Sequence, residues 1–486
     1  MLRRAFLRVG AKRFLFKRGD YMLFSSVSFI YYFLPVALIL YFAVPKKLRN
    51  IVMLVLSLVF YFYGERGYVL LLVASSIMDY IIGLLIEKYR DTKKAKFAVA
   101  FSMVVNLLIL GFFKYSDFLL ENINMLFGTN IPPLFIHLPL GISFFTFQTM
   151  SYSVDIYRGK AKAEKNPLNF AMYVSMFPQL VAGPIVRFNT VAEQIRERTH
   201  SFENFANGVG RFVTGLAKKV LIANTLGELS RVMMDSSSPS VLSHWLGIFA
   251  YVLQIYFDFS GYSDMAIGLG RFFGFDLLEN FNYPFIASSI SDFWRRWHIS
   301  MGTWFREYLY IPLGGNRVSK LKWMRNIFIV WLATGLWHGA DWNFIIWGLY
   351  FGVLLTLEKL FISKLLEKLP KFLRHLYTLM FVFFSFAIFY IESLPEMLQH
   401  LGGMFGALKI PLVNTESVYY LRSYALILIV ACVGATPIVK NLAYKLKEKQ
   451  AKLSTILEPA AYAVMLLVVT GYLIDSTFNP FLYFRF

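Results

Sequence analysis

The 486-residue chain is 57% hydrophobic and 18% aromatic, and only 16% of its residues are charged. Soluble domains usually carry about 25% charged residues, so this composition excludes an ordinary soluble protein. Apolar runs long enough to cross a bilayer recur from Met22 to the C-terminus, as they do in helical membrane proteins. The sequence therefore predicts an all-α, multi-pass transmembrane protein.

The net charge of +20 does not indicate nucleic-acid binding. The lysines and arginines lie in short breaks between apolar runs, as in cytoplasmic loops and membrane-interface anchors. No basic face stands apart from the membrane segments, so we expect membrane lipid and no nucleic acid among the partners. Cys432 is the only cysteine, which excludes an intramolecular disulfide and a thiolate metal cluster.

Residues 1–21 form a basic tail in front of the first apolar run, 22–44. Basic residues also follow this run, although both flanks favour the cytoplasm. The basic clusters at 46–49 and 88–96 share one side if the runs between them form a hairpin, which predicts an outside N-terminus. The tail is then atypical or precedes a native start at Met22, and residues 22–486 form a single transmembrane domain.

Apolar segments follow one another along this domain, and we expect about eleven spans. Two segments are broken: residues 177–184 read FPQLVAGP, and residues 287–315 are too polar and tryptophan-rich for a simple span. Broken backbone at membrane depth is tolerated where it is buried in protein or lines a cavity. We therefore predict a central channel with broken or re-entrant helices. The apolar segments are 22–44, 51–64, 68–86, 97–113, 134–154, 170–186, 241–270, 327–337, 344–360, 372–391, 424–439 and 460–474.

The stretch 291–310 has the pattern of one amphipathic helix, because aromatic and apolar residues recur in it at three- and four-residue spacing. Ser291 suits the N-cap, and Asp292 is placed to pair with Arg295 or Arg296. An interfacial helix with tryptophan and arginine anchors explains most of this pattern. It does not explain His298, which lies on or beside the aromatic face.

A second histidine, His338, ends an apolar run and is followed by Asp341 and Asn343. Ionisable groups are costly in lipid, so a histidine at membrane depth is a functional-site hypothesis. Loss of hydration favours the neutral imidazole, which can act as a general base on a hydroxyl. A structural histidine bonded to a backbone carbonyl is the alternative. His298 and His338 are far apart in sequence without an HxxxH or HExxH pattern, so we expect no metal.

Two acids, Asp258 and Asp264, lie in the apolar segment 241–270. On a straight helix they point about 240° apart, so both reach one site only if Gly261 breaks the helix. Hydrogen bonding within the helix bundle is the alternative to a role in substrate binding. The chain has no Gly-rich nucleotide loop and no GxSxG elbow, which argues against a soluble-type serine hydrolase. Broken helices would also suit a transporter.

Several longer motifs, taken together, point to one family. They are MLFSSVSFIYYFLPV at 22–36, SFFTFQTMSYSVDIYRG at 143–159, MFPQLVAGPIVRF at 176–188, YFDFSGYSDMAIGLGRFFGF at 256–275, FNYPF at 281–285, FWRRWHISMGTWFREYLYIPLGGNR at 293–317, WLATGLWHGADWNFIIWG at 331–348 and NPFLYFRF at 479–486. With these motifs the chain resembles the membrane-bound O-acyltransferase superfamily, in particular the bacterial alginate O-acetylation membrane proteins. The basic tail before Met22 departs from the family pattern.

The resemblance implies a helical ring around a thin centre, where funnels from both faces meet. It implies acetyl-CoA as cytoplasmic acyl donor, with no tightly bound cofactor. The family's essential histidine falls on His338, in WHGA, as general base. Its second active-site histidine falls on His298, in WHIS, which would orient the acyl group or stabilise oxyanion charge. The substrate-binding candidates are Arg295, Arg296, Asp258, Asp264 and Asn343, with interface anchoring as the alternative for the two arginines.

In related systems the acetyl group passes to an extracytoplasmic partner acetyltransferase that modifies a polysaccharide. The resemblance therefore implies a polysaccharide biosynthesis complex in the cytoplasmic membrane of a bacterium, with alginate-type O-acetylation as the expected reaction. Three alternatives stay open: D-alanyl transfer to teichoic acid within the same superfamily, a transporter or flippase without covalent chemistry, and a purely structural scaffold.

Overall fold

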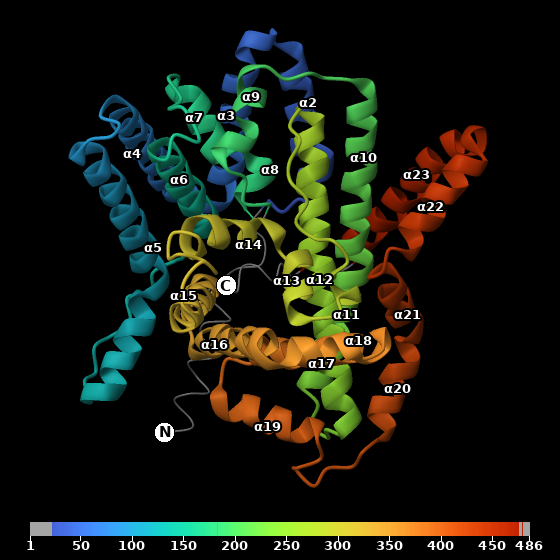
Figure 1. Cartoon of the computed structure of the whole chain (residues 1–486). Coiled ribbons are helices and arrows are strands. Elements are labelled where there is room, and N and C mark those ends of the chain that lie inside the picture. Colours follow the sequence, from blue (N-terminus) through green and yellow to red (C-terminus); the bar gives the residue numbers. More distant parts are fainter. Residues whose placement is uncertain (1–21, 182, 476–478, 480–486) are drawn as a thin grey trace.

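A computed structural model describes residues 22–181, 183–475 and 479 (Figure 1). All regular structure in these residues is helical, which confirms the predicted all-α class. The predicted basic tail at residues 1–21 lies outside the described residues, as does the C-terminal motif except for Asn479.

Five helical stretches of the described chain are long and apolar enough to cross a membrane, and a bent pair of helices makes up to six. The first stretch is divided at Arg66, where left-handed backbone (φ 38°) separates two helices. The count of about eleven spans stays a prediction. The stretches are Lys46–Lys88, Lys93–Phe127, Trp342–Lys368, Lys371–Tyr390 and Ala451–Asp475, with Thr415–Ser423 and Ala425–Gly434 as the pair bent by 56°.

The first part of the chain builds one side of the molecule (Figure 1, blue to green). The predicted span at 134–154 is helical only from Ile142, and the proline-rich segment at 170–186 is broken as predicted. The elements are η1 (Phe29–Phe33), α2 (Leu34–Ala43), η2 (Lys46–Leu48), α3 (Arg49–Glu65), η3 (Arg66–Tyr68), α4 (Val69–Lys88), α5 (Lys93–Phe127), α6 (Ile142–Tyr157), α7 (Pro167–Ser175), α8 (Phe177–Leu180) and α9 (Phe188–Arg196).

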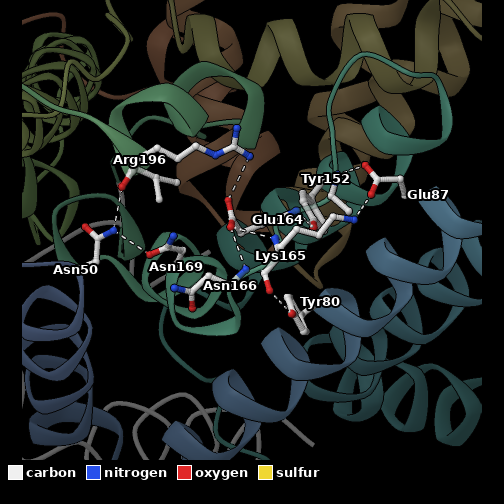
Figure 2. A network of polar contacts seen from close by, with 11 residues as sticks. Asn50, Tyr80, Glu87, Tyr152, Glu164, Lys165, Asn166, Asn169 and Arg196 are labelled. Atoms are coloured by element: carbon white, nitrogen blue, oxygen red, sulfur yellow. Dashed lines mark hydrogen bonds and ion pairs between the residues drawn. The ribbon is translucent and has the colours of Figure 1, made fainter. Parts of the chain in front are cut away.

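A polar network ties these helices together at one end (Figure 2). The Glu164 backbone N–H donates to the Tyr152 hydroxyl at 3.0 Å, and the Glu164 carboxylate pairs with Arg196 at 3.6 Å. The neighbouring Lys165 pairs with Glu87 of α4. The loop after α6 is therefore held to α4 and α9 at once.

Helices α10 and α12 pack backbone to backbone in the next part of the chain. A Cβ on Gly261 would lie 2.7 Å from the carbonyl oxygen of Gly215, and one on Gly268 would lie 2.7 Å from that of Gly208. Helix α12 starts with a Ser240–Ser243 capping box and continues through Gly261 without a break, so the condition for bringing both acids to one site is not met. The elements are α10 (Phe202–Ala217), η4 (Lys218–Ala223), α11 (Asn224–Met234) and α12 (Val241–Phe272).

The remaining helices extend from the centre of the molecule to its far side (Figure 1, yellow to red). Cys432 is exposed on α21. The elements are η5 (Pro284–Ile286), α13 (Ile290–Arg296), α14 (Ile299–Phe305), η6 (Arg306–Tyr310), α15 (Lys320–His338), α16 (Trp342–Leu357), η7 (Glu358–Ile362), α17 (Ser363–Lys368), α18 (Lys371–Tyr390), α19 (Leu394–Met404), α20 (Thr415–Ser423), α21 (Ala425–Gly434), α22 (Ile438–Lys449) and α23 (Ala451–Asp475).

The buried apolar side chains form two large clusters that meet around α13–α16. Trp337 belongs to the cluster of the N-terminal helices, and Trp297 belongs to the cluster of α11, α12, α16 and α18. Phe281 and Trp294 pack against both clusters. Figure 1 shows α13–α16 in the middle of the molecule, with α3–α6 on one side and α10–α12 on the other. His298 and His338 both lie where these two clusters meet, a boundary that we call the seam.

Candidate active site

His298 lies at a break between two short helices. Helix α13 ends at Arg296, Trp297 is extended, and His298 has left-handed backbone (φ 47°, ψ 54°) before α14 begins at Ile299. The predicted single helix over residues 291–310 is therefore wrong. Its predicted N-cap is also wrong, because Ser289 rather than Ser291 is the N-cap, and its side chain accepts the backbone N–H of Asp292.

The physical reason for the break is a backbone pairing with the segment before α13. The Asn282 N–H donates to the carbonyl oxygen of Arg296 at 2.9 Å, and the Ile299 N–H donates to that of Asn280 at 2.9 Å. These bonds take the place of the helical hydrogen bonds that would have joined α13 and α14 into one helix. Left-handed backbone in a non-glycine residue costs about 1–3 kcal/mol and is typical of functional sites.

Asn280 also holds the side chain of His298. Its Oδ1 lies 3.1 Å from His298 Nδ1, 3.1 Å from the backbone N of Ser300 and 2.9 Å from the Ser300 hydroxyl. The Ser300 hydroxyl in turn accepts the backbone N–H of Ile185 at 3.0 Å. Ser300 thus connects the proline-rich break at 177–184 to the His298 site.

His338 is the last residue of α15 and is held mainly by aromatic rings. Its ring centroid lies 5.0 Å from that of Trp337, 5.0 Å from that of Trp347 and 5.3 Å from that of Phe389, all at steep angles. His298 is 0% exposed and His338 is 8% exposed. Both imidazoles are therefore shielded from bulk solvent.

Two residues that the sequence analysis missed, Lys114 and Tyr115 of α5, hold the C-terminus of α15. The Lys114 ammonium donates to the carbonyl oxygen of Trp337 and, at 2.9 Å, to that of His338. The Tyr115 hydroxyl donates to the carbonyl oxygen of Leu336. The last carbonyls of a helix lack intrahelical partners and favour a nearby cation. A lysine at the end of the apolar run GFFK was the available signal.

The structure brings the two histidines together. The ring centroid of His298 lies 5.9 Å from that of Trp337, the same tryptophan whose ring centroid lies 5.0 Å from that of His338. Around them four buried polar atoms have no hydrogen-bond partner in the described part of the chain: His298 Nε2, His338 Nδ1, Asn343 Oδ1 and Trp347 Nε1. Native structures leave few buried polar groups unsatisfied, so this concentration indicates a place where a substrate supplies the partners.

Asn343 is the substrate-binding candidate that fits this site. Its Nδ2 donates to the carbonyl oxygen of Phe389 at 3.0 Å, and its Oδ1 is left without a partner among the residues described. Because the Phe389 ring contacts His338, Asn343 lies on the His338 side of the site. Its role in binding stays a prediction.

Arg295 and Arg296 make their contacts away from the histidine rings. Arg296 pairs with Asp292 at 3.2 Å, as predicted. It also donates to the carbonyl oxygen of Asn282, whereas the exposed Arg295 donates to that of Ser291. The interface-anchor interpretation fits these contacts, and a role toward donor phosphates stays a prediction.

Asp258 and Asp264 form ion pairs between α12 and its neighbours. Asp258 lies 2.6 Å from the buried Lys219, and Asp264 lies 2.7 Å from both Lys218 and Arg211. The adjacent lysines of η4 therefore reach two acids that leave α12 in different directions. These contacts fit the inter-helix alternative, and a substrate role for either acid stays a prediction.

Comparison with known protein families shows to which family this chain belongs. Residues 101–398, which include both histidines and more than half of the chain, match the model of the MBOAT, membrane-bound O-acyltransferase family. The chain belongs to this family. As a membrane-bound O-acyltransferase, it is a multi-pass membrane enzyme that transfers an acyl group to a hydroxyl.

Three relatives illustrate the range of acceptors in this family. The chain is 42% identical over 390 residues to a probable alginate O-acetylase of Azotobacter vinelandii, covering 79% of this chain and 78% of the relative. It is 37% identical over 421 residues to a peptidoglycan O-acetyltransferase of Helicobacter pylori, covering 79% and 80%. It is 31% identical over 271 residues to a teichoic acid D-alanyltransferase of Bacillus subtilis, covering 51% and 68%.

Proposed function

We propose that this O-acyltransferase takes an acetyl group from acetyl-CoA on the cytoplasmic side of a bacterial inner membrane and delivers it to an extracytoplasmic hydroxyl. The observation that carries the proposal is the pair of buried histidines, each in contact with Trp337 and each with a ring nitrogen that has no partner among the described residues. Similarity to two kinds of O-acetyltransferase supports acetyl as the transferred group.

In the proposed reaction His338 is the general base. Its neutral imidazole accepts the proton of the acceptor hydroxyl, whose oxygen attacks the thioester carbonyl carbon. A C–O bond forms and the C–S bond of the donor breaks. The proton then passes from the imidazolium to the departing sulfur, which yields the O-acetyl product and CoA. A site shared by donor and acceptor makes the transfer effectively unimolecular.

The fold supports a role for the protein in orienting this step. Lys114 and Tyr115 of α5 bind backbone carbonyls at the end of α15. These contacts fix the position of the His338 backbone, from which the imidazole extends. The unpartnered Trp347 N–H is a candidate donor to the oxyanion of the tetrahedral intermediate. In this proposal about eleven segments surround a central channel, through which donor and acceptor approach the seam from opposite faces.

The proposed acceptor is an extracytoplasmic partner acetyltransferase or a polysaccharide hydroxyl, within a polysaccharide biosynthesis complex. Relatives named for alginate and for peptidoglycan support a glycan as the final acceptor. D-alanyl transfer is the second candidate, because one relative at 31% identity is a teichoic acid D-alanyltransferase.

Transfer from labelled acetyl-CoA tests the proposal directly. Inverted membrane vesicles that contain the wild-type enzyme and its partner proteins are expected to move the label from acetyl-CoA to an acid-precipitable acceptor, and vesicles with His338→Ala at the same protein level are not. Label from a D-alanyl carrier protein but not from acetyl-CoA would select the D-alanyl candidate. Equal transfer by wild type and by a variant in which both histidines are alanine would support a scaffold. Movement of intact substrate without transfer would support a flippase.

A further inference from the structure

The contacts of Asn280 settle which of its side-chain atoms faces His298. A backbone N–H can only donate, so the Asn280 atom 3.1 Å from the Ser300 backbone N must be the carbonyl oxygen Oδ1. The amide nitrogen then lies toward Ser263, whose hydroxyl oxygen is 3.3 Å away and can accept. Both ends of the Asn280 amide are therefore assigned by their partners.

This orientation decides where the proton of His298 resides. Asn280 Oδ1 is an acceptor, and it lies 3.1 Å from His298 Nδ1. A neutral imidazole carries one N–H, which this contact places on Nδ1. Nε2 then has a free lone pair, and it is buried without a partner in the described residues. In the resting site His298 offers an acceptor, not a donor.

We propose that Asn280 is a positioning residue that holds His298 as the Nδ1–H tautomer, and that Nε2 accepts a hydrogen bond from a substrate hydroxyl or amide N–H. The part about the substrate rests on the proposed function. A neutral His298 in this tautomer cannot donate to an acyl oxyanion, so the oxyanion contact belongs to another group. Trp347 Nε1, which can only donate, is a candidate for this contact, because it lies beside His338 and has no partner among the described residues.

Two substrate groups could donate a hydrogen bond to Nε2 of His298, one on the acceptor and one on the donor. The acceptor brings a hydroxyl, and the pantetheine arm of CoA brings amide N–H groups and a hydroxyl. Both can donate to a lone pair at Nε2. The backbone break at His298 supports a built site, because the Asn280 segment supplies both the side-chain contact and the backbone bonds that set the left-handed turn.

Nitrogen NMR tests the tautomer without any assay of transfer. The chain has seven histidines, so the difference between spectra of 15N-histidine-labelled wild type and His298→Gln isolates the His298 signals. We expect a protonated, pyrrole-type Nδ1 and an unprotonated, pyridine-type Nε2. In Asn280→Leu the two forms are expected to mix. A pyrrole-type Nε2 in the wild type would overturn the proposal, whether or not the enzyme transfers acetyl groups.

Kinetics test the consequence of the tautomer. Asn280→Leu is expected to lower kcat by about 10²-fold, which is less than the roughly 10⁴-fold cost of a wrong tautomer at a catalytic base, because His298 is not the base. Asn280→Asp keeps an acceptor toward Nδ1 and is expected to recover most of the activity. Asn282→Leu is the matched control, since the Asn282 side chain makes no hydrogen bond within the described chain. A kcat for Asn280→Leu equal to that of Asn282→Leu would contradict the positioning role.

Binding of CoA distinguishes the two substrate groups. If His298→Ala leaves the Kd for CoA unchanged while kcat falls, Nε2 meets the acceptor hydroxyl. If the Kd for CoA rises, Nε2 meets the donor's amide or hydroxyl. If neither the Kd nor kcat changes, no substrate group uses Nε2 and the proposal fails.

Discussion

The regions around His298 and His338 hold different parts of the two histidines. At the α13–α14 break, a side-chain contact from Asn280 fixes the imidazole nitrogen, and the backbone adopts a costly left-handed turn. At the end of α15, Lys114 and Tyr115 fix the backbone carbonyls, while the His338 ring packs against the rings of Trp347 and Phe389. The first region fixes the position of a proton, and the second fixes the position of a residue.

This difference suits two different roles in proton transfer. A ring whose Nδ1–H is held by an amide keeps one tautomer, so it presents the same nitrogen throughout a reaction cycle. At His338, Nδ1 has no partner among the described residues, so no contact of the protein fixes its tautomer. The contacts therefore mark His298 as the fixed contact, while the proposal of His338 as the base rests on the family's essential histidine, which falls in WHGA.

Replacing each histidine by alanine gives the largest effect and tests the comparison first. We expect His338→Ala to lower acetyl transfer by about 10³-fold, within the range for loss of a general base. His298→Ala is expected to lower it less, since it removes a contact rather than the base. Initial rates with labelled acetyl-CoA, at equal enzyme amounts, measure both. A larger loss for His298→Ala would reverse the assignment of roles.

Trp347→Phe tests the donor on the His338 side. The phenyl ring keeps most of the packing against His338 and removes only the N–H. Loss of one oxyanion donor lowers kcat by about 10²–10³-fold in other enzymes, and we expect an effect toward the lower end with KM little changed. Trp294→Phe is the matched control, because its indole nitrogen is likewise buried without a partner among the described residues, and its ring packs on Trp331, Trp347 and Phe351 rather than on His338. Equal kcat values for the two variants would exclude the donor role.

Lys114→Met tests how the backbone of His338 is held. The substitution leaves two carbonyl oxygens at the end of α15 without their charged donor, which we expect to destabilise the fold by about 1–3 kcal/mol. We expect a lower melting temperature and a fall in kcat of about tenfold, because a small displacement of a catalytic group is costly. Lys94→Met is the control, since Lys94 is exposed near the start of the same helix. An unchanged kcat would mean that α15 and the Tyr115 contact position His338 without Lys114.

Arg295→Gln gives the smallest expected effect. It tests whether a residue near the histidine regions, but outside them, contributes to activity. Arg295 is exposed, and among the described residues its side chain bonds only within its own helix, so we expect its loss to change stability by about 0.5 kcal/mol or less. The KM for acetyl-CoA should also stay near the wild-type value. A marked rise in that KM would instead support a contact between Arg295 and the donor phosphates.

The two regions also differ in how far the sequence could predict them. The helical class and the Asp292–Arg296 pair follow from local patterns that residues near in sequence create, whereas the roles of both histidines came from the family resemblance and stay predictions. The break at His298 does not, because no proline or glycine marks WRRWHIS and the Asn280 segment causes it from outside the helix. The Lys114 contact joins positions 224 residues apart, and no local spacing encodes such a pair. Local periodicity therefore predicted the wrong, continuous helix over residues 291–310.

The position of Cys432 makes the membrane topology open to experiment. It is the only thiol in the chain and is exposed on α21, so Cys432→Ser yields a thiol-free protein after one exchange that leaves the buried cores untouched. Cysteines introduced singly into the connecting loops then react, or fail to react, with a membrane-impermeant maleimide added to intact cells. The resulting map of sidedness counts the crossings between successive loops, and it shows from which compartment each histidine is reached.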